Sequence, residues 1–271
     1  MKATILSLAL LLTANLASGQ SSAQLVSTDA FSIGEAVVLS SALLQENRQI
    51  NIYLPASYRS DSATAYPVIY LLDGGRDEDF IHVSGLVQFG SFPWIDLLPE
   101  SIVVGIANVD RKRDFTYPSR NALDQEEFPT SGKSEAFIAF LANELIPFME
   151  AGYRTSAEKT LIGQSLGGLL ATEVLFTEPD LFDNYIIVSP SLWWDDERLL
   201  AAEPVAYEAE KAVYIAGGKE GEVMERTTKE LYEKLRRNQR ANTHLFYDYL
   251  ADREHGDALH LAVYHAFERM F

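Results

Sequence analysis

The first apolar positions of the chain follow the two-residue period of a β-strand. Residues 48–54 alternate apolar and polar side chains, and a shorter apolar run at residues 37–39 precedes them. Such alternation is typical of a strand with one buried face and one solvated face. We therefore expect both segments to form strands at an antiparallel edge of a sheet, the second of them ending at Pro55.

Later apolar runs are continuous, as expected for strands buried on both faces of a parallel sheet. Between them lie segments with the 3.6-residue period of helices. The expected strands cover residues 67–72, 102–106, 160–163, 184–188, 212–216 and 243–249. The expected helices cover residues 137–145, 166–176, 224–235 and 256–270. This alternation predicts the α/β class, with a doubly wound, mostly parallel central sheet, an antiparallel N-terminal edge and helices on both faces.

Two long stretches, residues 73–99 and 108–131, show no clear period. Loops of that length in a compact domain are usually functional. No internal repeat or linker divides the chain after residue 31, and one core can serve a domain of this size. We therefore expect a single folded domain at residues 31–271, preceded by a flexible, Ser- and Gln-rich leader at residues 20–30.

The first 19 residues have the features of a secretory signal peptide. A positive start at Lys2 is followed by an apolar run at residues 4–16 and by small residues at 17–19. The apolar run is too short for a transmembrane helix. We expect export to the periplasm or the extracellular space, without insertion into a membrane.

The composition narrows the classes of partner. The chain has 22 Lys and Arg against 39 Asp and Glu, a net charge of −17, and no Cys. Disulfides are therefore excluded, and a surface of this charge repels nucleic acid. We expect no nucleic-acid partner, and the sequence does not indicate an oligomeric state.

Residues 163–167 read Gly-Gln-Ser-Leu-Gly and match the pattern G-x-S-x-G. An expected strand ends at Gly163 and an expected amphipathic helix starts after Ser165, which is the strand-turn-helix setting of a nucleophile elbow. In such a turn, side chains two residues before and after the Ser would collide with backbone, so Gly is expected at both places. Ser165 is therefore the candidate nucleophile, and the Leu166 amide is the candidate first donor to an oxyanion. A Gly-rich turn with an idle Ser is the alternative.

A nucleophilic Ser needs a base, and in this chain order the His follows the last strand. His255 alone has that position, between the expected strand at 243–249 and the last expected helix. The other four His are expected to pack or to lie on the surface: His82, His244, His260 and His265.

The acid that orients the His is expected after a strand between the nucleophile and the base. The loop after residues 212–216 offers Glu220 as the first candidate and Glu222 as the second. Asp195 and Asp196 are weaker candidates after an earlier strand. A Glu near a helix start also stabilises the helix dipole, so these carboxylates have a structural alternative.

The rest of the candidate site comes from loops after expected strands. The Gly75 amide is the candidate second oxyanion donor, although a plain turn would also use this glycine. Candidate substrate-binding residues are Arg76, Arg111, Arg113, Trp193 and Trp194. The two Trp can stack on a ring, or one can fill the core. The two later Arg can attract an anionic ester, or simply neutralise Asp110 and Asp114.

Four motifs in this order resemble the esterase D-like branch of the α/β-hydrolases, which includes siderophore, feruloyl and acetylxylan esterases, S-formylglutathione hydrolases and mycolyltransferases. They are Tyr-Leu-Leu-Asp-Gly at 70–74, the elbow with Gly168 and Leu169, Ser-Pro-Ser-Leu-Trp-Trp at 189–194, and Glu-His-Gly at 254–256. The resemblance runs from about Arg48 to the C-terminus. It implies the α/β-hydrolase fold, hydrolysis of a small-molecule ester, no cofactor and no metal, and the same roles for Ser165 and His255. Glu220 stands where members carry Asp, and some members use only a Ser-His pair.

These observations together predict a serine esterase with an acyl-enzyme intermediate. An acyltransferase to a sugar would differ only in the group that releases the acyl chain. An inactive binding protein of the same fold is the other alternative, but a binding protein would not need the strained turn.

Overall fold

The structure is a computed structural model that describes residues 24–237 and 241–271. It comprises two units, residues 1–32 and residues 33–271. Residues 24–32 form neither helix nor strand. The expected signal peptide at residues 1–19 lies outside the described residues. Within the described ranges, every helix is too short or too polar to span a lipid bilayer.

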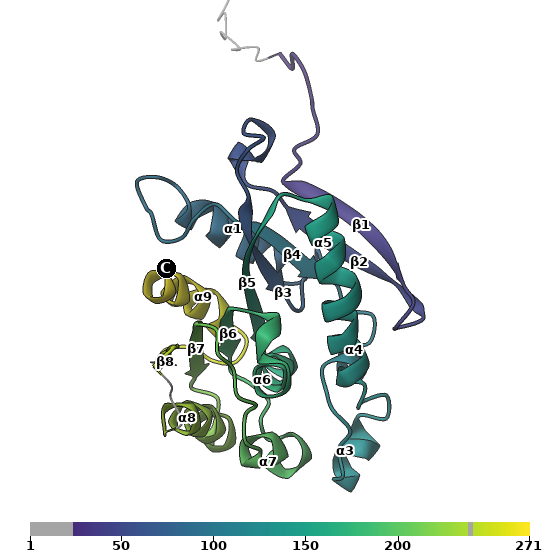
Figure 1. Ribbon diagram of the computed structural model, residues 1–271, viewed down its shortest axis with the longest axis vertical. Helices are drawn as coiled ribbons and strands as arrows, with labels where there is room; N and C mark the ends of the chain where they lie inside the picture. The colour runs from purple at the N-terminus through teal and green to yellow at the C-terminus, as the bar shows by residue number, and fades with distance from the viewer. Residues whose placement is uncertain (1–23, 238–240) are drawn as a thin grey trace, which may run out of the picture. The chain divides into compact units, whose positions relative to one another are not determined.

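Residues 33–271 are built on one eight-stranded sheet, in the order β1-β2-β4-β3-β5-β6-β7-β8 (Figure 1). The strands are β1 (Gly34–Ser41), β2 (Glu46–Tyr53), β3 (Tyr66–Leu71), β4 (Ile102–Ile106), β5 (Thr155–Gln164), β6 (Asn184–Val188), β7 (Lys211–Gly218) and β8 (Thr243–Leu250). Strand β2 runs antiparallel to both β1 and β4, and all other neighbours are parallel. The expected α/β class with an antiparallel N-terminal edge is confirmed.

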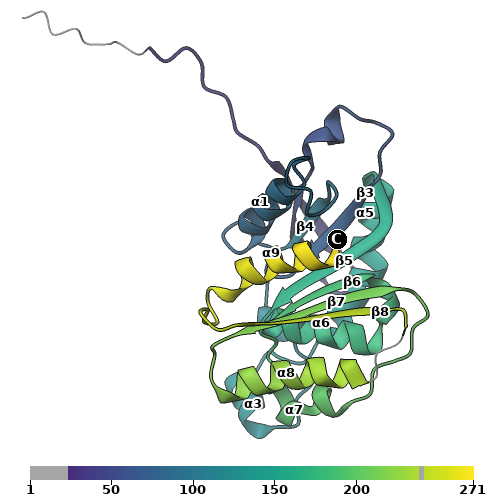
Figure 2. The same cartoon turned by 90° about the vertical axis from the view of Figure 1, so that its left-hand side faces the viewer.

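Helices cover both faces of the sheet (Figure 2). They are α1 (Phe80–Gly90), α2 (Arg111–Asp114), α3 (Ala122–Glu127), α4 (Ser134–Phe140), α5 (Ile146–Gly152), α6 (Leu166–Thr177), α7 (Trp194–Ala201), α8 (Glu222–Arg237) and α9 (Ala258–Met270). Short 3₁₀ turns are η1 (Ala56–Arg59) and η3 (Pro179–Leu181), and a π-helical turn, η2 (Leu141–Leu145), joins α4 to α5. One apolar core packs α1 and α9 on one face, and a second packs α4 to α6 and α8 on the other.

The two long stretches contain more structure than their sequence indicates. The first includes helix α1, in which Phe80, Val83 and Val87 are buried. The second includes the short helices α2 and α3. Gly85 lies inside α1, and the helix has no side-chain cap at its N-terminus. Tertiary packing therefore forms α1 where local signals are weak.

Helix α6 differs from the expected amphipathic helix. Every residue from Leu166 to Phe176 is buried. Its polar residues, Thr172 and Glu173, are buried as well, so the helix has no solvated face and the amphipathic interpretation was wrong. The nucleophile elbow consequently rests on a helix enclosed in the core, which keeps its first turn in place.

Candidate active site

The candidate residues lie at the carboxyl ends of four neighbouring parallel strands. Ser165 follows β5, Ser189 and Ser191 follow β6, Glu220 follows β7 and His255 follows β8. Side chains from this edge of an open α/β sheet converge on one place, where such folds bind ligands. The order of the strands thus brings together residues that are 90 positions apart.

Ser165 has the backbone of a strained turn, with φ 59° and ψ −120°. Its amide donates to the Val188 carbonyl at 3.0 Å, which ties the turn to β6. A Cβ on Gly163 would lie 2.3 Å from the Gly167 carbonyl oxygen. Strain of this kind in a non-glycine residue costs free energy and marks functional turns. The hydroxyl is thereby presented at the strand end.

Two glycines meet backbone at the elbow, but they are not the expected pair. A Cβ on Gly168 would lie 2.9 Å from Pro190 Cα, whereas a Cβ on Gly167 would meet side-chain atoms at 3.3 Å or more. The expectation of a backbone collision two residues after Ser165 was therefore wrong. The close approach occurs one residue later, where α6 passes the loop after β6.

His255 and Glu220 are joined by a hydrogen bond at the site. Nδ1 of His255 donates to Oε2 of Glu220 at 2.5 Å, and the Glu220 side chain is only 2% exposed. The other carboxylate oxygen accepts from the Ser189 hydroxyl and from the Gly218 amide. Burial alone would raise the pKa of Glu220, but these hydrogen bonds outweigh it and the pKa lies below its ordinary value. Glu220 is therefore ionised at neutral pH.

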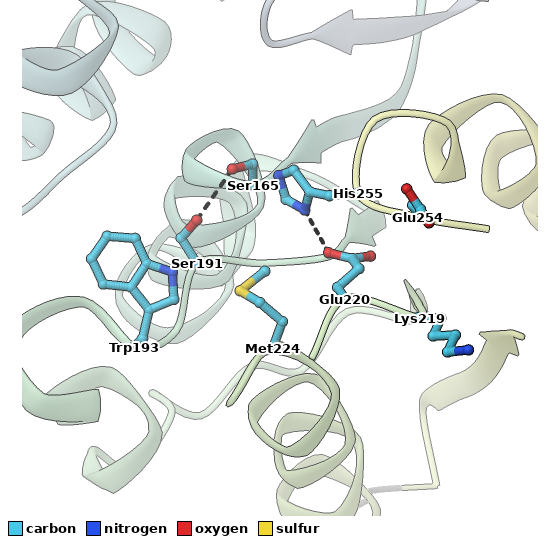
Figure 3. Close-up of a pocket in the computed structure, with 8 residues that line it drawn as sticks. All are labelled: Ser165, Ser191, Trp193, Lys219, Glu220, Met224, Glu254 and His255. Atoms are coloured by element: carbon cyan, nitrogen blue, oxygen red, sulfur yellow. Dashed lines mark hydrogen bonds and ion pairs between the residues drawn. The ribbon is translucent and has the colours of Figure 1, made fainter. Parts of the chain in front are cut away.

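An ionised acid fixes the tautomer of the imidazole. Because the carboxylate can only accept, the proton of neutral His255 resides on Nδ1 and Nε2 carries the lone pair. Figure 3 shows the ring between Glu220 and Ser165, with its second nitrogen on the side of Ser165. This is the arrangement in which an imidazole can take a proton from a serine hydroxyl.

Ser165 opens into a pocket of about 500 Å³ (Figure 3). The lining residues are Ser165, Ser191, Trp193, Lys219, Glu220, Met224, Glu254 and His255. The hydroxyls of Ser165 and Ser191 are 3.2 Å apart and hydrogen-bonded. The pocket combines Ser165 and His255 with one aromatic and one thioether side chain, Trp193 and Met224, and so can hold a mainly apolar group beside Ser165.

The other candidate acids make different contacts. Glu222 is exposed in the first turn of α8. Asp195 accepts from the Arg120 amide and pairs with Arg198, and Asp196 accepts from Asn121. Among the four candidates, Glu220 alone bonds to His255 in the structure.

The two candidate oxyanion donors differ in availability. Leu166 begins α6, so its amide has no acceptor within the helix and points from the positive helix end. The Gly75 amide already donates to Oε2 of Glu78 at 2.7 Å. Oε1 of Glu78 accepts from Asn108 at 2.8 Å, which holds the carboxylate in place. The structure therefore shows the second expected donor occupied by a side chain of the protein.

A second hollow of about 360 Å³ also reaches Ser165 and His255. Its lining also includes Asp73, Glu78, Asp79 and Arg111. Burial, together with the neighbouring carboxylates of Asp73 and Glu78, raises the pKa of Asp79 to about 6. The second hollow beside Ser165 is thus acidic, in contrast to the first pocket, which Trp193 lines.

The expected basic cluster is largely neutralised within the protein. Arg111 is bound in a bidentate manner by Asp73, with N–O distances of 2.6 and 2.8 Å. Arg113 pairs with Glu46 and Asp114 and does not line either hollow. The expectation that Arg113 contacts substrate is corrected, because its guanidinium nitrogens are already hydrogen-bonded to these two carboxylates.

The remaining substrate-binding candidates also differ in whether they line a pocket. Trp193 lines the pocket, but Trp194 is fully buried and its Nε1 donates to the Tyr117 carbonyl at 2.9 Å. A side chain without exposed surface does not reach a substrate, so Trp194 is corrected to a core residue. Arg76 is 76% exposed, is 3.8 Å from Asp77, and lines neither hollow. The substrate contact of Arg76 therefore stays a prediction.

Several residues of the site were missed by the sequence reasoning. Ser189 bonds to Glu220 and Ser191 to Ser165, and both lie in the first three positions after the buried strand β6, which was the available signal. Glu78 lies in the long stretch at residues 73–99, where its sequence does not distinguish it from a surface residue. Met224 lies on helix α8, where its sequence does not distinguish it from a core residue. Their roles depend on tertiary packing alone.

A comparison with known protein families finds one that covers most of the chain. Residues 40–260 match the family model described as "Putative esterase". Ferri-bacillibactin esterase BesA of Bacillus subtilis is 32% identical over 186 residues, which cover 64% of each chain. A siderophore enterobactin esterase of Emericella nidulans is 38% identical over 99 residues, one third of each chain. The chain thus spans just under two thirds of the length of BesA.

Solved structures of similar proteins have the same fold as this chain. An IroE-like serine hydrolase from Shewanella oneidensis superposes with a TM-score of 0.79 at 28% identity, covering 88% of this chain and 80% of that chain. The BES protein from Bacillus cereus superposes with a TM-score of 0.78 at 25% identity, covering 92% and 98%. The fold described above is therefore the fold of known serine hydrolases.

Proposed function

This chain belongs to the "Putative esterase" family, and on that premise we propose that it is a serine carboxylic-ester hydrolase with Ser165 as nucleophile, His255 as base and Glu220 as acid. One observation carries the proposal: the imidazole of His255, held by the buried Glu220, lines the same pocket as the strained Ser165. A serine hydroxyl beside an oriented imidazole is what nucleophilic acyl transfer requires.

The reaction proceeds by acyl transfer in two halves. Oγ of Ser165 attacks the ester carbonyl carbon while Nε2 of His255 takes the hydroxyl proton. The bond between the carbonyl carbon and the alcohol oxygen then breaks, and the alcohol leaves with the proton that His255 returns to it. Water attacks the acyl-enzyme with His255 again as base, which releases the acid and restores Ser165.

The negative charge that develops on the carbonyl oxygen requires donors near the elbow. The Leu166 amide supplies one donor and the positive end of α6 adds to it. The Gly75 amide supplies the second once the Glu78 carboxylate moves away. Two backbone donors would stabilise the oxyanion in the transition state more than in the ground state.

The pocket favours an ester whose acyl part carries an apolar or aromatic group. Trp193, Met224 and Lys219 all line the pocket that contains Ser165. A ring can stack on Trp193, and an anionic ring substituent can meet Lys219. The named activities of BesA and of the Emericella enzyme support a siderophore-type ester as the substrate class.

Turnover of three esters tests the proposal: p-nitrophenyl acetate, a feruloyl ester and a ferric catecholate siderophore. We expect the wild type to hydrolyse the activated ester and at least one aromatic ester, and Ser165→Ala to lose all of these activities. Transfer of the acyl group to an added sugar in place of water would identify an acyltransferase. Equal rates for wild type and Ser165→Ala would reject the mechanism.

A further inference from the structure

Gln164, the last residue of β5, makes hydrogen bonds in two directions. Its side-chain Nε2 donates to the main-chain oxygen of His255 at 2.6 Å. Its own main-chain oxygen accepts from Nη2 of Arg111 at 3.2 Å. The residue immediately before the nucleophile is therefore bonded directly to the backbone of the base, 91 positions later in the chain.

His255 needs such an anchor because it stands on neither a helix nor a strand. It lies in the turn between β8 and α9, and its side chain is 46% exposed. The bond to Glu220 fixes the rotation and tautomer of the ring. The Lys219 amide holds the turn two residues earlier, at the Arg253 carbonyl, and the bond from Gln164 holds the main chain of His255 itself. Displacements of about 1 Å between reacting groups can cost a hundredfold in rate.

Gln164 is itself held from the opposite side. Arg111 contacts both the Gln164 carbonyl and the Asp73 carboxylate, which follows β3. Asp73 is 9% exposed and binds the guanidinium through both of its oxygens. A bidentate pair of this kind is geometrically rigid. A connected path of hydrogen bonds therefore runs from the end of β3 through β5 to the turn that carries His255.

We propose that Gln164 is a positioning residue, which sets the distance between Ser165 and His255, and that Arg111 and Asp73 brace it. This inference rests on the proposed function, since it requires His255 to be the base. Gln164 acts through His255, so its contribution must vanish when the imidazole is absent. Arg111 accordingly serves the nucleophile turn rather than an anionic substrate.

A double-mutant cycle on p-nitrophenyl acetate tests the proposal. Gln164→Leu removes the donor at similar size, and we expect kcat to fall at least about tenfold with KM changed less than about twofold. In a His255→Ala background the same substitution is expected to change the residual rate by less than about twofold. The matched control is Gln125→Leu, which removes an equivalent bond from Nε2 to the Ser119 carbonyl, and it should keep the wild-type kcat.

The outcomes separate the two hypotheses. If His255→Ala keeps the wild-type rate, the proposed function is wrong, whatever Gln164 does. If Gln164→Leu lowers kcat by the same factor with and without His255, Gln164 acts on the elbow or the substrate and the inference is overturned. Gln164→Glu, which keeps the size but lacks the donor, replaces Gln164→Leu if urea unfolding shows that the latter is not folded. A wild-type kcat in a folded Gln164 variant also overturns the inference that Gln164 positions His255.

Discussion

His255 and Glu220 lie 35 positions apart in the chain, yet Nδ1 of the imidazole and Oε2 of the carboxylate are 2.5 Å apart. The contact joins the loop after β7 to the turn after β8, two strands that are neighbours in the sheet. The carboxylate is almost fully buried and receives two more hydrogen bonds, from Ser189 and from the Gly218 amide. Hydrogen bonds therefore fix both the imidazole ring of His255 and the Glu220 carboxylate that orients it.

Replacement of this acid should disable the base. A neutral Gln at position 220 permits the wrong imidazole tautomer, so we expect Glu220→Gln to lower kcat on p-nitrophenyl acetate at least about a hundredfold. Glu222→Gln changes an exposed side chain two residues away and serves as the control, with a change below about twofold. An unchanged kcat in Glu220→Gln would indicate a Ser-His pair without an acid.

The same carboxylate should make stability depend on pH. The pKa of Glu220 is lowered in the folded protein, so the unfolded chain binds more protons as the pH falls. The stabilisation is complete above the ordinary carboxyl pKa of 4.5 and is lost as the pH drops through the lower folded value. Urea unfolding of wild type and Glu220→Gln should show a gap in unfolding free energy that narrows below pH 4.5. A gap that widens on acidification would contradict this sign.

The two adjacent tryptophans should respond differently to truncation. Trp194→Ala empties a fully buried site and is expected to lower the free energy of unfolding by about 3–5 kcal/mol. Trp193→Ala removes a pocket wall, so it should raise KM for a feruloyl ester several-fold and lower the unfolding free energy by less than half as much. Urea unfolding and steady-state kinetics on both variants check this. The reverse pattern would place the substrate elsewhere.

Removal of the Glu78 carboxylate should open the second oxyanion donor. Because the Gly75 amide is occupied by Glu78, Glu78→Ala is expected to raise kcat on p-nitrophenyl acetate up to about tenfold. Glu78→Gln retains an oxygen that can accept from Gly75 and should stay within about twofold of wild type. A fall in kcat for Glu78→Ala would show that the carboxylate supports the site instead of closing it.

Much of the fold could be predicted because the strands and main helices are long apolar or periodic segments. The strand at residues 184–188 was predicted with the observed bounds. Helix α1 could not, because Gly85 interrupts its pattern and packing against α9 stabilises it from a distant part of the chain. The complete burial of α6 also escaped prediction, since Thr172 and Glu173 suggest a solvated side that tertiary packing covers.

The candidate site could be predicted where chain order decides it. Ser165, Glu220 and His255 each follow a strand, and the structure brings all three to one pocket. The direction in which a side chain points could not be predicted from chain order. The sequence does not show that Trp194 points inward or that Arg113 forms an ion pair with Glu46, because both depend on side-chain packing between distant segments.

The claim that Ser165 carries the acyl group is tested most directly by peptide mass spectrometry of protein quenched during turnover of p-nitrophenyl acetate. The predicted result is one acetyl group on the peptide that contains Ser165, together with a loss of at least about three orders of magnitude in kcat for Ser165→Ala. An acetyl group found only on another residue, or wild-type turnover by Ser165→Ala, would contradict the account.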